Sequence, residues 1–161
     1  MSPAFVRIDS RLIHGQIIEA WLPYLNTNNI IVIDDSAAGN LLQKSVMEMS
    51  VSKPLSLKIY SINEAIKNLA ELNCLNDSLI LFSSLEDIYK MYNSGFKFNS
   101  LNIGNLHFCK GKKQVSNTVC LNNEEIDIIK SLKEAGLKIS IQVVPSEKII
   151  DIEKIWDILN T

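Results

Sequence analysis

Histidine occurs only twice in this 161-residue sequence, at His14 and His107. His14 lies in the stretch FVRIDSRLIHGQIIEAW, where a short apolar run ends and a segment with helical spacing begins. A neutral imidazole has a nitrogen lone pair that can attack phosphorus, whereas a serine hydroxyl would need a base and would form a more inert ester. His14 is therefore our candidate for a reversible carrier of phosphate.

The residues around His14 supply the other groups that phosphoryl transfer needs. Arg11 can offer a planar fork of donors to the phosphoryl oxygens, and Asp9 can orient either that guanidinium or the imidazole. A helix that begins near Gly15 presents free N–H groups and the positive end of its dipole to an anion. A histidine at a helix start is also commonly a capping or core residue, so these residues alone leave both roles open.

Other polar residues have simpler expected roles. Arg7 should point to the opposite face of its strand from its neighbours, where we expect a structural ion pair. Asp34 and Asp35 end the second apolar run and are expected to cap helices rather than bind a cation. His107 could bind a metal together with Cys109, but this pair lacks the third and fourth ligands that zinc requires, so we expect no metal site.

The composition is that of an ordinary globular protein. With a formal net charge of −2 and 47% hydrophobic residues, the chain has no global basic field that would hold nucleic acid. The three cysteines are odd in number and include no C-x-x-C pair, which argues for a reducing compartment. Neither a signal peptide nor a membrane-length apolar run is evident, so we expect a cytoplasmic protein. Glycine motifs for nucleotide phosphates are also missing, so we expect no cofactor.

Short apolar runs alternate along the chain with longer segments whose apolar residues recur three and four positions apart. The runs predict strands at 4–8, 29–33, 55–60, 78–82, 100–103 and 138–144. The longer segments predict helices at 15–25, 37–49, 62–72, 85–94 and 124–135. Start and stop signals agree with these helices, with capping boxes at Ser61/Glu64 and Ser83/Glu86 and terminal glycines at Gly95 and Gly136.

Strands and helices that alternate in this way predict a single domain over residues 1–161. The expected fold is doubly wound α/β, a mainly parallel sheet with helices on both faces. In such sheets ligands bind beyond the carboxyl ends of the strands, which is where DSRLIH lies. The long irregular stretch 104–123, with Lys110, Lys112 and Lys113, could hold another short extended segment. It is either a functional loop or a surface loop with solvated lysines.

Several of these stretches together resemble one protein family. VRIDSRLIHGQ followed by AW, and then NIIVIDDSAA, resembles the start of the IIB subunits of the mannose, fructose and sorbose family of bacterial phosphotransferase systems. The similarity continues through LNIGNLHFCKGKKQVSNTVCL and LKEAGLKISIQVVP, and so covers nearly the whole chain. One departure is GNLH, where the family pattern leads us to expect GGMH.

The resemblance implies a function and its partners. In that family the histidine of this motif accepts phosphate from the IIA subunit and passes it to a sugar brought through the membrane by the IIC and IID subunits. The matching residue here is His14, with phosphate expected on Nδ1, and Arg11 matches the arginine that assists transfer. The protein would then be a protein-N(π)-phosphohistidine–sugar phosphotransferase, peripherally associated with the membrane transporter, with a homodimer left open.

The resemblance also implies that the stretch 104–123 borders the site, which makes His107 and Lys110 candidate contacts for phosphate or for a partner. Two other interpretations remain. A nonenzymatic sensor or adaptor of the same fold would bind a small anion beside Arg11 without being phosphorylated. A flavodoxin-like protein would bind nucleotide or flavin stoichiometrically.

Overall fold

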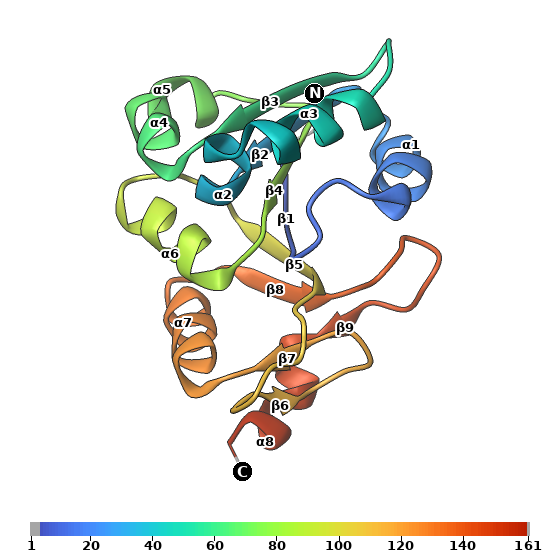
Figure 1. Cartoon of the computed structure of the whole chain (residues 1–161). Coiled ribbons are helices and arrows are strands. Elements are labelled where there is room, and N and C mark those ends of the chain that lie inside the picture. The colour runs from blue at the N-terminus through green and yellow to red at the C-terminus, as the bar shows by residue number, and fades with distance from the viewer. Residues whose placement is uncertain (1–3, 161) are drawn as a thin grey trace.

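The computed structural model describes residues 4–160 (Figure 1). Within this range, seven strands form one sheet in the order β3-β2-β4-β1-β5-β8-β9. Neighbouring strands are parallel except β8 and β9, which are antiparallel. The strands span Phe5–Asp9 (β1), Asn29–Ile33 (β2), Ser56–Tyr60 (β3), Ser78–Phe82 (β4), Ser100–Asn105 (β5), Lys138–Ile141 (β8) and Ile150–Asp151 (β9).

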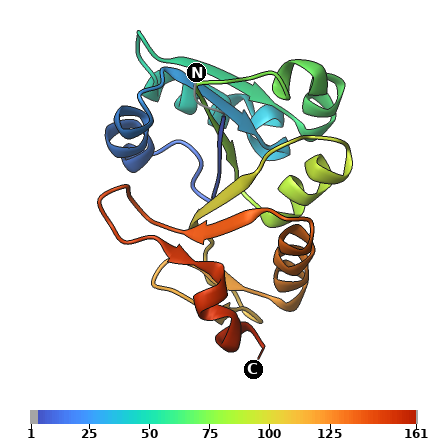
Figure 2. The ribbon, with the colours of Figure 1, turned by 180° about the vertical axis from the view of Figure 1, so that it is seen from behind.

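Helices cover both faces of this sheet (Figures 1 and 2). One face carries the π-helix η1 (Ile17–Trp21), α1 (Leu22–Leu25), α2 (Asp35–Gly39) and α3 (Leu41–Ser50). The other face carries α4 (Ile62–Lys67), α5 (Leu69–Leu72), α6 (Leu85–Asn93) and α7 (Asn123–Glu134). The 3₁₀ helix η2 (Ile152–Ile155) and α8 (Trp156–Leu159) follow β9. The predicted doubly wound α/β fold is confirmed.

The core consists of two apolar layers, one on each face of the sheet. Successive side chains of β4 point to opposite faces of the sheet. Ile80 and Phe82 therefore pack in one layer, and Leu79 and Leu81 pack in the other. Every residue of β4 is buried, which explains why its last four residues, Leu79 to Phe82, are an unbroken apolar run rather than an alternating one. Each such side chain stabilises the fold by roughly 1.5–3 kcal/mol when fully buried.

The connections that follow β1 and β5 leave the carboxyl ends of these neighbouring strands in opposite directions. The chain leaves β1 over one face of the sheet and leaves β5 for α7 on the other face. Ligands bind where two neighbouring connections diverge in this way. The two departing segments are joined at their start, because Ser10 N donates to Asn105 O (3.0 Å) and Ser10 Oγ donates to Asn105 Oδ1 (2.8 Å).

Two predicted helices are each divided by an asparagine. In the segment 37–49, the side chain of Asn40 accepts a hydrogen bond from Gln43 N (3.0 Å) and starts a new helix. In the segment 62–72, the Asn68 amide donates to Glu64 O (2.8 Å) where α4 ends. Asparagine competes with helical hydrogen bonding in this way, which helical spacing alone does not reveal.

The predicted helix ends are largely correct. Ser61 and Glu64 form the capping box of α4. Gly95 and Gly136 lie just beyond α6 and α7, with φ angles of +105° and +93° that other residues rarely adopt.

The capping box predicted at Ser83 and Glu86 is wrong by one residue. Ser84 caps α6 and accepts a hydrogen bond from Asp87 N (3.2 Å). Ser83 donates instead to the side chain of Asp34 at the end of β2.

The two aspartates after β2 bind helix N-termini as predicted. Asp34 Oδ1 accepts from Ala37 N (2.7 Å) at the start of α2. Asp35 Oδ1 accepts from Ile62 N (2.8 Å), and so satisfies the first turn of α4 instead of its own helix.

Two further segments differ from or extend the prediction. The stretch 104–123 contains the antiparallel strands β6 (Lys113–Gln114) and β7 (Cys120–Leu121), so the expected extra extended segment is present. The strand predicted at 138–144 ends at Ile141, because the next two carbonyls accept hydrogen bonds from an arginine of β1.

None of the helices in residues 4–160 is long and apolar enough to cross a membrane.

Candidate functional site

Asp9, the last residue of β1, lies at the centre of the site and is fully buried. The chain turns sharply after it, because Asp9 O accepts from Leu12 N (2.9 Å) and Asp9 Oδ1 accepts from Arg11 N (3.1 Å). Leu12 has a φ of +57°, a conformation that costs energy for a bulky side chain, and its side chain is buried beneath the turn. This turn brings the residues that follow back over the carboxylate.

His14 contacts the carboxylate of Asp9. Its Nε2 lies 3.1 Å from Asp9 Oδ2, and its side chain is 17% exposed. Because a carboxylate accepts and cannot donate, Nε2 carries the proton in this contact. In the neutral ring Nδ1 then holds the free lone pair. The peptide carbonyl of His14 accepts from Ile17 N and Ile18 N, so the ring lies at the start of the helix, as predicted.

Arg11 binds the same carboxylate from the solvent side. Its Nε donates to Asp9 Oδ1 and its Nη2 to Asp9 Oδ2, each at 3.1 Å. Nη2 also donates to Gln16 Oε1 (3.2 Å). The side chain is 34% exposed, and within residues 4–160 its Nη1 has no hydrogen-bond partner. Arg11 is thus fixed at one edge, and its Nη1 is left to donate to an anion.

These contacts determine the charge of Asp9. Burial on its own would raise the pKa of this carboxyl group, but hydrogen bonds from His14 and Arg11 lower the pKa to about 2. Burial lowers the pKa of Arg7 to about 10, although the negative charge of Asp9 acts in the opposite direction. Near neutral pH the site therefore contains one carboxylate and two guanidinium cations.

Arg7 forms the ion pair expected from the sequence. Its partner is Asp9, because Arg7 Nη2 lies 3.3 Å from Asp9 Oδ2. Its remaining contacts were not predicted. They are made with Asn102 on β5 and with the carbonyls of Gln142 and Val143 after β8. One signal for them exists in the sequence, because Asn102 is a polar residue between Leu101 and Ile103 in a predicted strand. In the structure it pairs in register with Arg7.

The structure does not bring His107, Lys110 or Gly15 into contact with the Asp9 carboxylate. His107 and Lys110 are exposed. His107 lines a hollow of about 190 Å³, together with Asn105 and Thr118. Gly15 begins the helix, and a Cβ added to it would have no atom within 4 Å, so packing does not require glycine there.

The three lysines of the stretch 104–123 do not form one solvated cluster. Lys112 Nζ binds Glu125 Oε1 (2.6 Å), and both side chains are largely buried. Lys113 Nζ donates to Ile158 O (3.2 Å) in the C-terminal helix. Of the two alternatives for this stretch, the solvated one does not hold for Lys112, which anchors the stretch to the first turn of α7.

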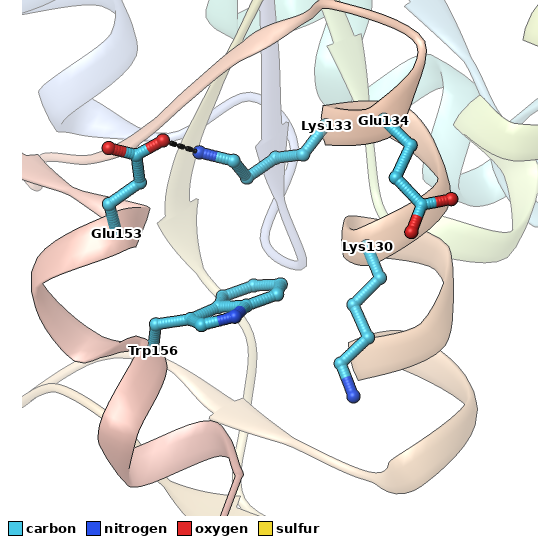
Figure 3. A pocket seen from close by; sticks show the side chains of 5 residues that line it. All are labelled: Lys130, Lys133, Glu134, Glu153 and Trp156. Carbon is cyan, nitrogen blue, oxygen red and sulfur yellow. Dashed lines mark hydrogen bonds and ion pairs between the residues drawn. The ribbon is translucent and has the colours of Figure 1, made fainter.

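One hollow of the surface has a volume of about 600 Å³ and is lined by residues of the α6–β5 and α7–β8 connections. Another, of about 420 Å³, lies between α7 and the C-terminal helices (Figure 3). Trp156 faces Lys130 across it, and Lys133 forms an ion pair with Glu153. Neither hollow is lined by a residue of the Asp9 site. Residues 4–160 contain no cluster of three or more potential metal ligands.

Comparison with known proteins identifies the family. The model of the family "PTS system sorbose subfamily IIB component" matches residues 3–161. The N-acetylgalactosamine-specific phosphotransferase enzyme IIB component 2 of Escherichia coli K12 is 30% identical over 149 residues, which is 92% of this chain and 95% of that protein. The mannose-specific EIIAB component of the same strain is 27% identical and matches 91% of this chain but 46% of its own length.

The fold comparison agrees. The crystal structure of the IIBSor domain of the sorbose permease from Klebsiella pneumoniae has a TM-score of 0.87 and 25% identity, and the match covers 98% of this chain and 97% of that domain. The resemblance predicted from the sequence is thus confirmed over nearly the whole chain. The protein belongs to the family of sorbose-subfamily IIB components of the sugar phosphotransferase system.

Proposed function

We propose that His14 is the residue that carries phosphate in this IIB component, and that Nδ1 is the atom to which phosphorus binds. Family membership makes the protein a phosphoryl-transfer subunit of sugar uptake. The observation that supports His14 as the carrier is its contact with Asp9 through Nε2, which leaves the lone pair of Nδ1 for phosphorus.

The transfer has a simple balance of bonds and protons. Nδ1 attacks phosphorus, the bond between phosphorus and the donor breaks, and the electron pair of that bond stays with the donor. The proton on Nε2 remains in its hydrogen bond with Asp9, where the carboxylate stabilises the positive charge that develops on the ring. In the second step the N–P bond breaks and its electron pair returns to Nδ1, while the oxygen of a sugar hydroxyl binds phosphorus and the hydroxyl proton passes to solvent.

The free edge of Arg11 is well placed for the phosphoryl oxygens. A guanidinium binds two oxygens with parallel hydrogen bonds and stays charged throughout the reaction. Because Arg11 Nη1 has no partner in residues 4–160, it can bind phosphate without first breaking a protein contact. We assign Arg11 to the stabilisation of charge in the transition state.

The donor in this proposal is a phosphorylated IIA protein. The name of the mannose-specific EIIAB relative combines A and B in one chain, which supports a IIA protein as the neighbour in the phosphate relay. Membrane subunits IIC and IID would supply the sugar, so we propose a peripheral position at the membrane. His107 and Lys110 are proposed contacts for these partners, because the segment they belong to starts beside Ser10.

The test is phosphorylation in a reconstituted relay. The protein is incubated with phosphoenolpyruvate, the two general phosphotransferase proteins and a IIA protein, and phosphate that is labile in acid and stable in base is mapped by mass spectrometry. We expect it on His14, and we expect His14→Ala to remain folded by circular dichroism but unlabelled. The matched control is His107→Ala, which should still be labelled.

Two results would contradict the proposal. Labelling of His14→Ala at the wild-type rate would place the phosphate elsewhere. A wild-type protein that binds phosphate reversibly but is never labelled would support an anion-binding adaptor instead.

A further inference from the structure

Arg7 is a buried arginine whose hydrogen bonds hold it rigidly beneath the site. Its Nη1 donates to Gln142 O (2.8 Å) and to the side chain of Asn102. Its Nη2 donates to Val143 O (2.9 Å) and to Asp9 Oδ2 (3.3 Å). These four acceptors match the four hydrogens of the two terminal nitrogens. The side chain is fully buried, so Arg7 cannot reach a phosphoryl group at His14.

The aspartate next to the phosphate acceptor creates an electrostatic problem. A phosphoryl group carries nearly two negative charges, and an uncompensated carboxylate in contact with His14 would repel it. Arg11 neutralises Asp9 in the structure, but the phosphoryl oxygens compete for the same guanidinium. A second cation that cannot move away would remove this conflict.

We propose that Arg7 is a positioning residue that serves as the permanent counterion of Asp9 and so frees Arg11 for the phosphoryl group. This inference rests on the proposed role of His14. With Arg7 in place, the group of Asp9, Arg7 and Arg11 has an excess of one positive charge. Without Arg7, the charge of Arg11 would neutralise the Asp9 carboxylate, and no positive charge of this group would remain to offset the incoming phosphate.

The surroundings of Arg7 contact its guanidinium group closely on several sides. The guanidinium carbon lies 4.5 Å from the centre of the Trp21 ring, as in a cation–π contact. On another side the backbone of β5 approaches so closely that a Cβ at Gly104 would lie 1.8 Å from Arg7 Nη2. Trp21 Nε1 also donates to Val143 O (3.0 Å), so this carbonyl holds both side chains. The pocket therefore fixes the cation and leaves the carboxylate to orient His14.

The inference is tested by changing the charges of Arg7 and Asp9 separately and together. Single-turnover transfer from phosphorylated IIA is measured for Arg7→Met, Arg7→Lys, Asp9→Asn and the double variant Arg7→Met/Asp9→Asn. We expect Arg7→Met to slow transfer on the order of 10- to 100-fold, with the apparent KM for IIA unchanged, because the lost charge acts in the transition state. Arg7→Lys, which keeps the charge, should lose much less.

The double variant separates a charge effect from a packing effect. If Arg7 acts as the counterion, Arg7→Met should slow transfer about tenfold less in the Asp9→Asn background than in the wild-type protein, because no carboxylate then needs a counterion. Trp21→Phe is the matched control, because it removes a hydrogen bond to the same Val143 carbonyl without a change of charge, and it should slow transfer far less than Arg7→Met.

Each outcome decides the inference. Should Arg7→Met fail to fold, the thermal melting of the double variant replaces the rate as the measurement, and restored folding supports the counterion role. The inference is overturned if Arg7→Met costs as much rate and stability in the Asp9→Asn background as in the wild-type protein, or if Arg7→Met transfers at the wild-type rate while His14 is labelled. Absence of label on wild-type His14 would instead overturn the proposed function.

Discussion

At the scale of single residues, the chemistry of the site depends on how Arg11 divides its donors. Two of its nitrogens bind Asp9, one of these also binds Gln16, and Nη1 binds neither of these partners. An arginine used in this way contributes most when charge on the phosphoryl group redistributes. Its loss should therefore affect the rate of transfer more than the docking of the donor protein.

We predict that Arg11→Ala lowers the rate of transfer from phosphorylated IIA to His14 on the order of 10² to 10³, as removal of a donor does in comparable electrostatic sites. Arg11→Lys should recover part of this loss, because it keeps the charge but loses the planar fork. Rapid-quench measurement of single turnovers gives the rate, and titration with unphosphorylated IIA gives the affinity. Wild-type rates in Arg11→Ala would reduce Arg11 to a structural neighbour of Asp9.

The sequence predicts these residues to different degrees for a geometric reason. Asp9, Arg11 and His14 lie within six positions of one another, so a turn after the first strand is enough to bring them together. The partners of Arg7 lie far along the chain, at a separation of 95 residues for Asn102 and 135 for Gln142. Only the pairing of strands places them in contact, which a local pattern cannot show.

At the scale of elements, the strands were predictable because buried parallel strands form continuous apolar runs. The strand predicted at 29–33 has those bounds in the structure, and so does the strand at 78–82. Prediction was poorer where polar side chains compete with the backbone. Asn40 and Asn68 divide helices, and Arg7 takes the carbonyls that would have extended β8.

Gly104 of β5 provides a test of how closely this strand and Arg7 fit together. A Cβ at this position would lie 1.8 Å from Arg7 Nη2 and 2.2 Å from Arg7 Cζ. The guanidinium cannot move aside without breaking hydrogen bonds that hold it on several sides. We predict that Gly104→Ala destabilises the fold by about 1–3 kcal/mol, the usual cost of overpacking, and also slows phosphoryl transfer.

Urea unfolding measures this cost, with Gly39→Ala as the control. No atom lies within 4 Å of a Cβ at Gly39, and its φ is outside the left-handed region, so alanine should be neutral or slightly stabilising there. If Gly104→Ala is as stable and as active as Gly39→Ala, the arginine is more mobile than its hydrogen bonds indicate.

At the scale of the whole molecule, the site is linked to global stability because its central carboxylate is buried in the fold. The ionised side chain of Asp9 is bound by Arg7, Arg11 and His14, and these groups come together only when the chain is folded. The pKa of Asp9 is therefore lower in the folded protein, at about 2, than its ordinary value of 3.8. Proton binding to this one group then favours the unfolded chain.

The sign of this linkage fixes the pH range of the effect. Above the ordinary pKa of 3.8 the full contribution of Asp9 is present, and it is lost as the pH falls through about 2. The shift corresponds to about 2 kcal/mol of unfolding free energy. We predict that, between pH 5.5 and pH ~2, wild-type protein loses about 1–2 kcal/mol more than Asp9→Asn does. Urea unfolding at both pH values measures the difference, in which the other carboxyl groups cancel. Equal losses in the two proteins would mean that Asp9 titrates in the folded protein as it does in the unfolded chain, and that its hydrogen bonds do not hold the charge that orients His14.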